Sequence, residues 1–234
     1  MRKVDAFLKR ISFIELPNVF NPYAQQCPIH DLPGAPQIRK ENLRIFLTAA
    51  IENGVGDIWM GRDLGYRGGR RTGLALTDEV RLPALSQLCE AQPLQRATVG
   101  PPMAERTATV VWKLIQEVGR IPFLWNAFPF HPFGCGEPMS NRCHSRNELK
   151  QVWEVNEMLF DLLQPNRYIG IGNDAVALLT TQGLCCEYVR HPSYGGQSDF
   201  EAGIRRLYKL PSRPASGGTL SGAFQCQHAL AFAD

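Results

Sequence analysis

Apolar residues recur along the chain in two patterns. Segments in which they lie three or four residues apart predict amphipathic helices, and residues 145–163 carry the strongest of these patterns. Short, continuous apolar runs predict strands that are buried on both faces. The predicted helices are 4–14, 37–53, 105–118, 145–163, 174–182 and 200–210, and the predicted strands are 57–60, 121–125, 168–171 and 184–189.

The alternation of strand and helix along the chain determines the predicted fold class. It favours an α/β fold, a three-layer sandwich with a central, mostly parallel four-stranded sheet flanked by helices. We expect residues 1–210 to form a single domain, in which 1–36 are an N-terminal helix and a long loop. Residues 211–234 are rich in Ser, Gly and Ala and predict a tail. Residues 61–73, dense in Gly and Arg, cannot form a regular helix.

The composition excludes several classes of protein. The chain has 234 residues, of which 44% are hydrophobic, and a net charge of +3, so it is not a disordered chain. Apolar runs fall well short of the roughly 18 residues of a membrane span. Residues 1–14 are charged and lack the apolar region of a signal peptide. We therefore expect a cytoplasmic monomer without a membrane partner.

The seven cysteines do not predict a disulfide framework in a chain of this length without an export signal. Cys185 and Cys186 lie in an apolar stretch, and we expect them in the core. One group of side chains has the residue types of a metal or iron–sulfur site, but it contains no Cys-x-x-Cys pair, so we expect neither metal nor cofactor. Its members are His131, Cys135, Cys143 and His144, with Cys27 and His30 upstream.

Polar residues follow three of the predicted strands, where ligands bind in parallel sheets. The first strand leads into the segment GRDLGYRGGRRTGL at 61–74, which brings the carboxylate of Asp63 among glycines. Asn126 follows the second strand, and its amide can donate and accept at once, as a planar base edge requires. His191 follows the last strand and can donate to a developing anion, while Ser193 can bind a phosphate.

Taken together, these motifs resemble those of the uracil-DNA glycosylase superfamily, over residues 57–208. The spacing from Asp63 to the pair Gly73-Leu74 is that of the classical Gly-Gln-Asp-Pro-Tyr and Gly-Leu motifs. The segment GYRG at 65–68 is similar to part of a motif of a bacterial branch, and residues 191–193 match the His-Pro-Ser motif. The resemblance implies an atypical bacterial member, in the cytosol or nucleoid, that acts on single- or double-stranded uracil-containing DNA.

The resemblance also implies residue roles. The enzyme would flip uracil out of the DNA and hydrolyse its N-glycosidic bond, leaving an abasic site. Asp63 would orient or activate water and stabilise the oxocarbenium-like sugar, and His191 would stabilise the uracil anion. Asn126 would read the base. The other implied base-binding residues are Gly61, Arg62, Tyr66 and Leu76. The implied DNA contacts are Arg67, Arg70, Arg71, Thr107 and Ser193.

The chain departs from the family pattern around the base. Leu64 replaces the motif proline, and Arg62 replaces Gln or Glu. Leu76 stands where the family has an aromatic ring that stacks on the base, a role for which Phe128 and Phe130 are the alternatives. Gly65 stands where classical members have the Tyr that blocks the thymine methyl group.

Tyr66 is the alternative residue for blocking the methyl group. The departures from the family pattern motivate a second hypothesis, a protein that binds uracil-DNA without turnover and attaches to it covalently through His191. A third hypothesis is an unrelated α/β nucleotide-binding enzyme.

Overall fold

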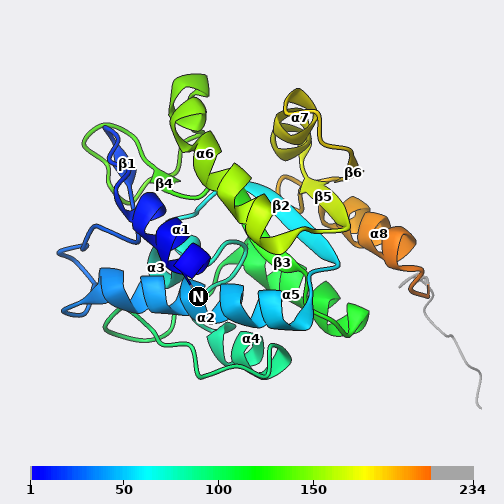
Figure 1. Ribbon diagram of the computed structural model, residues 1–234, viewed down its shortest axis with the longest axis horizontal. Coiled ribbons are helices and arrows are strands. Elements are labelled where there is room, and N and C mark those ends of the chain that lie inside the picture. Colours follow the sequence, from blue (N-terminus) through cyan, green and yellow to red (C-terminus); the bar gives the residue numbers. More distant parts are fainter. Residues whose placement is uncertain (1, 212–234) are drawn as a thin grey trace, which may run out of the picture.

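The computed structural model describes residues 2–211, and the statements below concern these residues. The predicted tail lies outside them except for Pro211. At the centre is a four-stranded parallel sheet in the order β3-β2-β5-β6 (Figure 1). Its strands are β2 (Asp57–Asp63), β3 (Phe123–Phe128), β5 (Arg167–Ile171) and β6 (Cys186–Val189). A separate antiparallel pair is formed by β1 (Val19–Phe20) and β4 (His131–Pro132).

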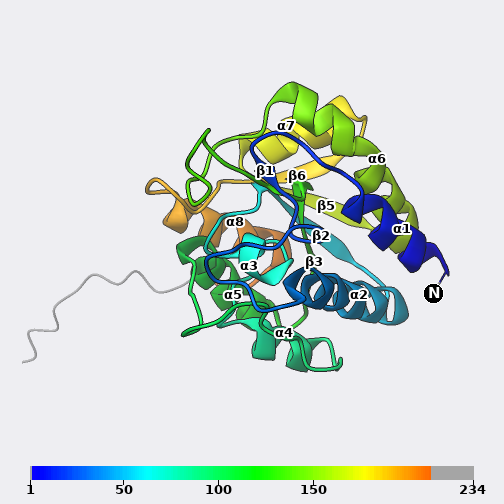
Figure 2. The ribbon, with the colours of Figure 1, turned by 90° about the vertical axis from the view of Figure 1, so that its left-hand side faces the viewer.

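Helices cover both faces of the sheet, which confirms the predicted fold class. One face is covered by α1 (Arg2–Ser12), α2 (Ala35–Asn53), α6 (Arg146–Leu163) and α7 (Asn173–Thr181). Figures 1 and 2 show α1 and α6 side by side on this face. The other face is covered by α5 (Arg106–Val118) and α8 (Gln197–Tyr208). The short helices α3 (Gly69–Thr72) and α4 (Leu82–Leu88) lie in the segment between β2 and α5.

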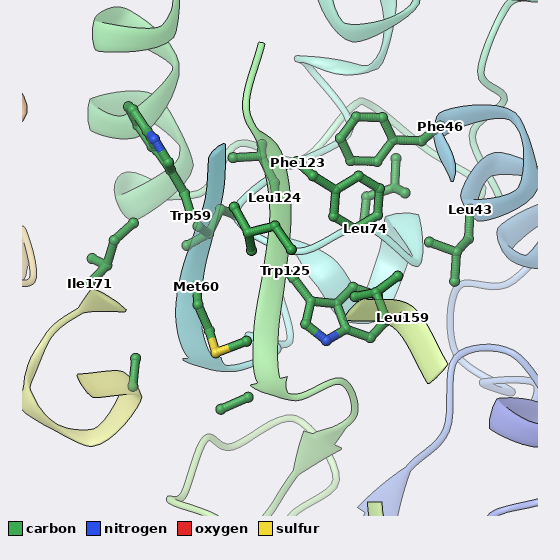
Figure 3. Packing of buried hydrophobic residues seen from close by; sticks show 14 of the residues in the cluster. Leu43, Phe46, Trp59, Met60, Leu74, Phe123, Leu124, Trp125, Leu159 and Ile171 are labelled. Carbon is green, nitrogen blue, oxygen red and sulfur yellow. The ribbon is translucent and has the colours of Figure 1, made fainter. Parts of the chain in front are cut away.

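Alternate side chains of the central strands supply the core on the two faces. Phe123 stacks on Phe46 of α2 with ring centroids 4.5 Å apart, and the indole of Trp125 donates to Asn156 of α6 at 2.8 Å. Trp59 points to the opposite face (Figure 3). There its ring centroid lies 6.3 Å from that of Phe200 of α8. Side chains buried on both faces explain why the strands are continuous apolar runs in the sequence.

The structure differs from the prediction at the ends of the strands and in the Gly- and Arg-rich segment 61–73, where residues Gly69–Thr72 form the one-turn helix α3. β2 continues through Gly61 and Arg62 to Asp63, and Asn126 lies inside β3, where it is paired in register with Gly61. The expectation that Cys185 is a core residue is wrong, because Cys185 is exposed just before the edge strand β6. Cys186, the first residue of β6, is half-buried and packs against the core.

A capping box begins α6 and so fixes the chain just before it. The Ser145 hydroxyl accepts a hydrogen bond from the backbone N–H of Glu148, and the Glu148 carboxylate accepts one from the N–H of Ser145. Arg142 donates to both oxygens of the same carboxylate, at 2.6 and 2.9 Å. His144 lies between Arg142 and this cap, so its position is set by contacts on both sides.

None of the described helices is long and apolar enough to cross a membrane.

Candidate active site

A cavity of about 380 Å³ opens where the carboxyl ends of β2, β3, β5 and β6 meet. Its volume lies in the range of small-ligand sites. Seven of the residues singled out in the sequence line it, although they come from distant parts of the chain. These seven are Arg62, Asp63, Leu76, Thr107, Asn126, His191 and Ser193.

The carboxylate of Asp63 is held on both of its oxygens. Nε of Arg62 donates to Oδ2 at 2.6 Å, and Nδ1 of His144 donates to Oδ1. Arg62 also donates to Oδ2 of Asp174 at 2.8 Å, which ties the end of β2 to the start of α7. The ring of His144 stacks on Phe128, with centroids 5.1 Å apart. These contacts give the carboxylate one orientation at the cavity wall.

The surroundings of Arg62 also change its own pKa. Burial lowers its pKa, but the hydrogen bond that it donates to Asp174 and the charge of Asp63 outweigh burial and leave the pKa above its usual value. Arg62 therefore remains a cation beside Asp63.

Asn126 lines the cavity, and its amide oxygen Oδ1 is a buried acceptor without a partner among the described residues. The residue is only 2% exposed. A β-carbon at Gly61 would overlap this oxygen, so only glycine at that position leaves room for the amide. An unpaired buried acceptor costs about 1–3 kcal/mol, and a ligand N–H in the cavity would remove that cost.

His191 presents a hydrogen-bond donor to the cavity. Its Nδ1 accepts the backbone N–H of Ser193 at 3.2 Å and lies 2.7 Å from the Ser193 hydroxyl, so the proton of the neutral ring is on Nε2. Burial, together with the charges of Arg62 and Arg190, lowers the pKa of His191 to about 4. The imidazole is therefore neutral near pH 7 and donates through Nε2–H.

Ser193 and Leu76 have structural roles in this geometry. Both donors of Ser193, its hydroxyl and its N–H, serve His191, so a phosphate contact would require the hydroxyl to turn away. Leu76 is 8% exposed and adopts a left-handed backbone conformation with φ 53°. That conformation costs a non-glycine residue on the order of 1 kcal/mol or more. Its side chain forms part of the apolar wall.

The prediction that Arg70 contacts DNA phosphates is wrong. Arg70 is 3% exposed, and its guanidinium lies over the ring of Phe20, 3.8 Å from the centroid. Its Nη1 donates to Nδ1 of His131 at 2.8 Å and to the carbonyl of Pro138 at 3.0 Å. The side chain holds α3 against the β1–β4 pair instead of facing solvent.

The same prediction is wrong for Arg71. This residue is 7% exposed, its Nε donates to Glu79 at 3.0 Å, and its Nη2 donates to Thr98 at 2.8 Å. Arg71 is thus one half of an internal ion pair. Both arginines look like a basic surface loop in the sequence because their partners are far along the chain.

Arg67 and Tyr66 lie outside the set of residues that line the cavity. Arg67 is exposed, and its Nε donates to the Tyr66 hydroxyl at 2.8 Å. The backbone N–H of Tyr66 donates to Asn141 at 3.1 Å. The structure therefore does not bring the Tyr66 ring to the cavity wall, but Arg67 is free to contact solvent or a partner.

The sequence assigned no role at this cavity to Glu105, Arg142 and His144. Glu105 marks a helix start and His144 belongs to the possible metal ligands, and their proximity to Asp63 or its loop arises from tertiary packing. Tyr194 lines the rim with 97% of its surface exposed and φ 51°. A large exposed aromatic directly after the His-Pro-Ser motif is the one signal that was available.

The surroundings of Glu105 change the pKa of its carboxyl group. Its carboxyl group occupies the space beside Gly65 and Gly68, where a β-carbon at either glycine would overlap it. Burial and the charge of Asp78, partly offset by Arg67, raise the pKa of Glu105 to about 7.

The histidines and cysteines considered as metal ligands have other contacts. His131 lies between Arg70 and the Ser140 carbonyl, and Sγ of Cys27 lies 3.7 Å from Nδ1 of His30. Within residues 2–211, no group of three or more His, Cys, Asp or Glu side chains is arranged to hold a metal ion.

Comparison with known proteins gives a structural match without a sequence match. No protein-family model and no curated protein matches the sequence. The fold is similar to the crystal structure of wild-type SMUG2 from Pedobacter heparinus, with a TM-score of 0.59 and 13% sequence identity. The match covers 88% of this chain and 95% of that one. At this level of identity the likeness establishes the fold that the two proteins share, and the activity of this chain has to be argued from the residues of the cavity.

Proposed function

We propose that this protein is a DNA glycosylase that hydrolyses the N-glycosidic bond of uracil in DNA. The observation that carries the proposal is that Asp63, Asn126 and His191 line one cavity with complementary hydrogen-bonding groups. The similarity of fold to SMUG2 supports a uracil-DNA glycosylase-like protein. The base would enter the cavity after rotation out of the DNA stack.

The cavity has groups for both charges that develop when the bond breaks. The sugar becomes cationic, and the carboxylate of Asp63, oriented by Arg62 and His144, stabilises it and orients the attacking water. The base departs with the electron pair, and Nε2–H of His191 donates to its oxygen. A preorganised donor of this kind contributes roughly 3–4 kcal/mol to the transition state.

Asn126 supplies the base selectivity in this proposal. Its unpaired Oδ1 accepts the N–H of uracil, and its amide N–H₂ donates to a uracil carbonyl. Cytosine has an unprotonated ring nitrogen and an amino group at the corresponding positions, so it would leave the buried Oδ1 unpaired. An unpaired polar group in a binding site is a strong basis for discrimination.

Basic side chains and free backbone N–H groups around the cavity are suited to bind DNA phosphates. Arg190 and Arg142 line it, Arg67 is exposed on the adjacent loop, and Thr107 lies in the first turn of α5, where backbone N–H groups are free to bind a phosphate. Tyr194 on the rim is suited to contact the bases next to the flipped one.

The structure gives no support to covalent attachment through His191. Nδ1 is occupied by Ser193 and Nε2 carries the proton, so neither nitrogen has a free lone pair for attack on the sugar. Binding without turnover is retained as an outcome of the test.

The test uses a labelled oligonucleotide that contains one uracil, followed by alkali treatment and a denaturing gel. We expect strand breakage with the wild-type protein, reduced breakage with His191→Ala and none with Asp63→Asn. A shifted band that survives heating, without breakage, would indicate a binding protein. Neither result at any protein concentration would exclude both uracil-DNA hypotheses.

A further inference from the structure

The carboxyl group of Glu105 is a second acidic group in the cavity, which the proposed mechanism leaves unused. Glu105 lines the cavity together with Asp63, Asn126 and His191. Its backbone is fixed, because its N–H donates to Oδ2 of Asp78 at 2.7 Å and its carbonyl accepts the N–H of Thr109 at 2.9 Å. The side chain makes no capping bond to its own helix. It turns instead toward the glycine loop after β2.

The glycine loop is shaped around this carboxyl group. The two carboxyl oxygens occupy the positions that β-carbons would take at Gly65 and Gly68. A side chain at either position would push Glu105 out of the wall. The two glycines of the loop therefore leave room at the cavity for the carboxyl group of Glu105, which directly precedes α5.

Glu105 and Asp63 have opposite environments within one cavity. Asp63 receives hydrogen bonds from Arg62 and His144. Among the described residues, the Glu105 carboxyl makes no hydrogen bond and no ion pair. Two carboxyl groups in such different environments are suited to different roles.

The charges that face Glu105 come from several elements. Asp78, whose other contact is an ion pair with Arg81 at 2.8 Å, disfavours a second negative charge, and Arg67 of the glycine loop favours it. The other charged groups that line the cavity are Arg62 and Asp63 on β2, Arg142 before α6, Asp174 of α7 and Arg190 after β6. Burial and Asp78 dominate, so the pKa of Glu105 is about 7 and a large fraction of the protein holds this proton at neutral pH.

We propose that Glu105, in its protonated form, donates a hydrogen bond to the base in the cavity and makes the rate of base release depend on its proton. The inference rests on the proposed function. The bond between the sugar carbon and the base nitrogen breaks with both electrons going to the base, and water supplies the hydroxyl group to the sugar. The proton from water neutralises the base, and Glu105 keeps its own proton throughout.

The first test is the pH dependence of single-turnover base release. For the wild-type protein we expect the rate to fall as the pH rises through about 7, because Glu105 loses its proton. His191, with its pKa near 4, does not titrate in that range. Glu105→Gln keeps a neutral donor of the same shape, so we expect a rate within about threefold of the wild type at low pH and no fall above pH 7. Glu105→Ala should be at least about tenfold slower than the wild type at low pH, as expected for a lost hydrogen bond, and should show no fall above pH 7.

Glu52→Gln is the matched control, because Glu52 is exposed near the end of α2. It should retain both the rate and the fall with pH. Thermal melting of each variant separates misfolding from a loss of the donor. The inference is overturned if Glu105→Gln keeps the wild-type fall with pH, or if it is as slow as Glu105→Ala throughout.

A second measurement is independent of turnover. In protein with ¹³C-labelled Glu carboxyl groups, the Glu105 signal is identified by its absence from Glu105→Gln and is titrated with and without free uracil. We expect uracil to raise the pKa of Glu105, because the bound base accepts its proton in a hydrogen bond. If the pKa shifts but uracil-DNA is not cleaved, the inference on base contact stands and the proposed function fails. If DNA is cleaved but neither the titration nor the pH profile depends on Glu105, the inference fails and the function stands.

Discussion

Nδ1 of His144 donates a hydrogen bond to Oδ1 of Asp63, although the two residues lie 81 positions apart in the chain. The ring stacks on Phe128, at the end of the strand paired with β2, and it directly precedes the capped start of α6. His144 therefore fixes the carboxylate of Asp63 relative to α6 and β3. A group that holds another in place affects the rate through geometry.

Removal of His144 should lower turnover more than substrate binding. For His144→Ala we expect kcat to fall by about 10- to 100-fold with little change in KM, because the carboxylate loses one of its two orienting contacts. His144→Asn, whose amide can donate in place of Nδ1, should recover part of the loss. Equal effects on kcat and KM, without recovery in the Asn variant, would contradict a positioning role.

Gly61 should be intolerant of the smallest side chain. In Gly61→Ala the new methyl group overlaps Oδ1 of Asn126, so the amide is displaced, and we expect kcat/KM on uracil-DNA to fall at least about tenfold. Gly56→Ala is the control, since a β-carbon there meets only the flexible end of Arg120, at 3.4 Å. Steady-state kinetics of both variants give the comparison. Equal activity would mean that Asn126 does not require the space at Gly61.

The arginines of the loop should separate into structural and DNA-contacting residues. Arg71→Met removes the closer of the two arginines that pair with the buried Glu79 and leaves only Arg96, at 3.5 Å, so we expect a loss of about 3 kcal/mol of unfolding free energy in urea titrations. Arg67→Met should change stability by less than about 0.5 kcal/mol but weaken DNA binding, with a salt dependence smaller by about one charge. The assignment of Arg71 as a structural residue would be contradicted if the Arg71→Met protein were as stable as the wild type but bound DNA more weakly and with a smaller salt dependence.

Stability should fall as the pH drops from about 6.5 toward 4. Burial and the charge of Arg70 lower the pKa of His131 to about 4, while the unfolded chain has a His pKa near 6.5. In this range the unfolded state binds a proton that the native state does not. The stabilisation is therefore complete above about 6.5 and is lost as the pH approaches 4.

His191, with a pKa also near 4, adds to the same slope. Urea titrations across this pH range should give a slope smaller by up to about 1.4 kcal/mol per pH unit in His131→Asn, because each proton contributes that amount. An unchanged slope in the variant would show that His131 is protonated in the native protein.

The part of the fold that depends on local pattern could be predicted from the sequence. Apolar runs at β2, β3, β5 and β6 and the helical periodicity of α6 are properties of short segments. Asp63, Asn126 and His191 were identified because each stands at or near the end of a strand, where parallel topology brings side chains together.

Residues whose environment depends on distant segments could not be predicted. Arg70 and Arg71 have the composition of a solvated loop, and only the folded chain brings Phe20, Glu79 and Thr98 to them. Glu105 marks the start of a helix in the sequence. Its contact with Gly65 and Gly68 follows from the packing of α5 against the loop after β2.

The most direct test of the proposed function is the chemical fate of the base and the sugar. Uracil-containing DNA is incubated with the protein in ¹⁸O-labelled water, and the products are measured by mass spectrometry. We predict that free uracil and abasic sites form in equal amounts, that the sugar gains one ¹⁸O, and that Asp63→Asn releases no uracil. Absence of free uracil with the wild-type protein, or equal release by Asp63→Asn, would contradict the account.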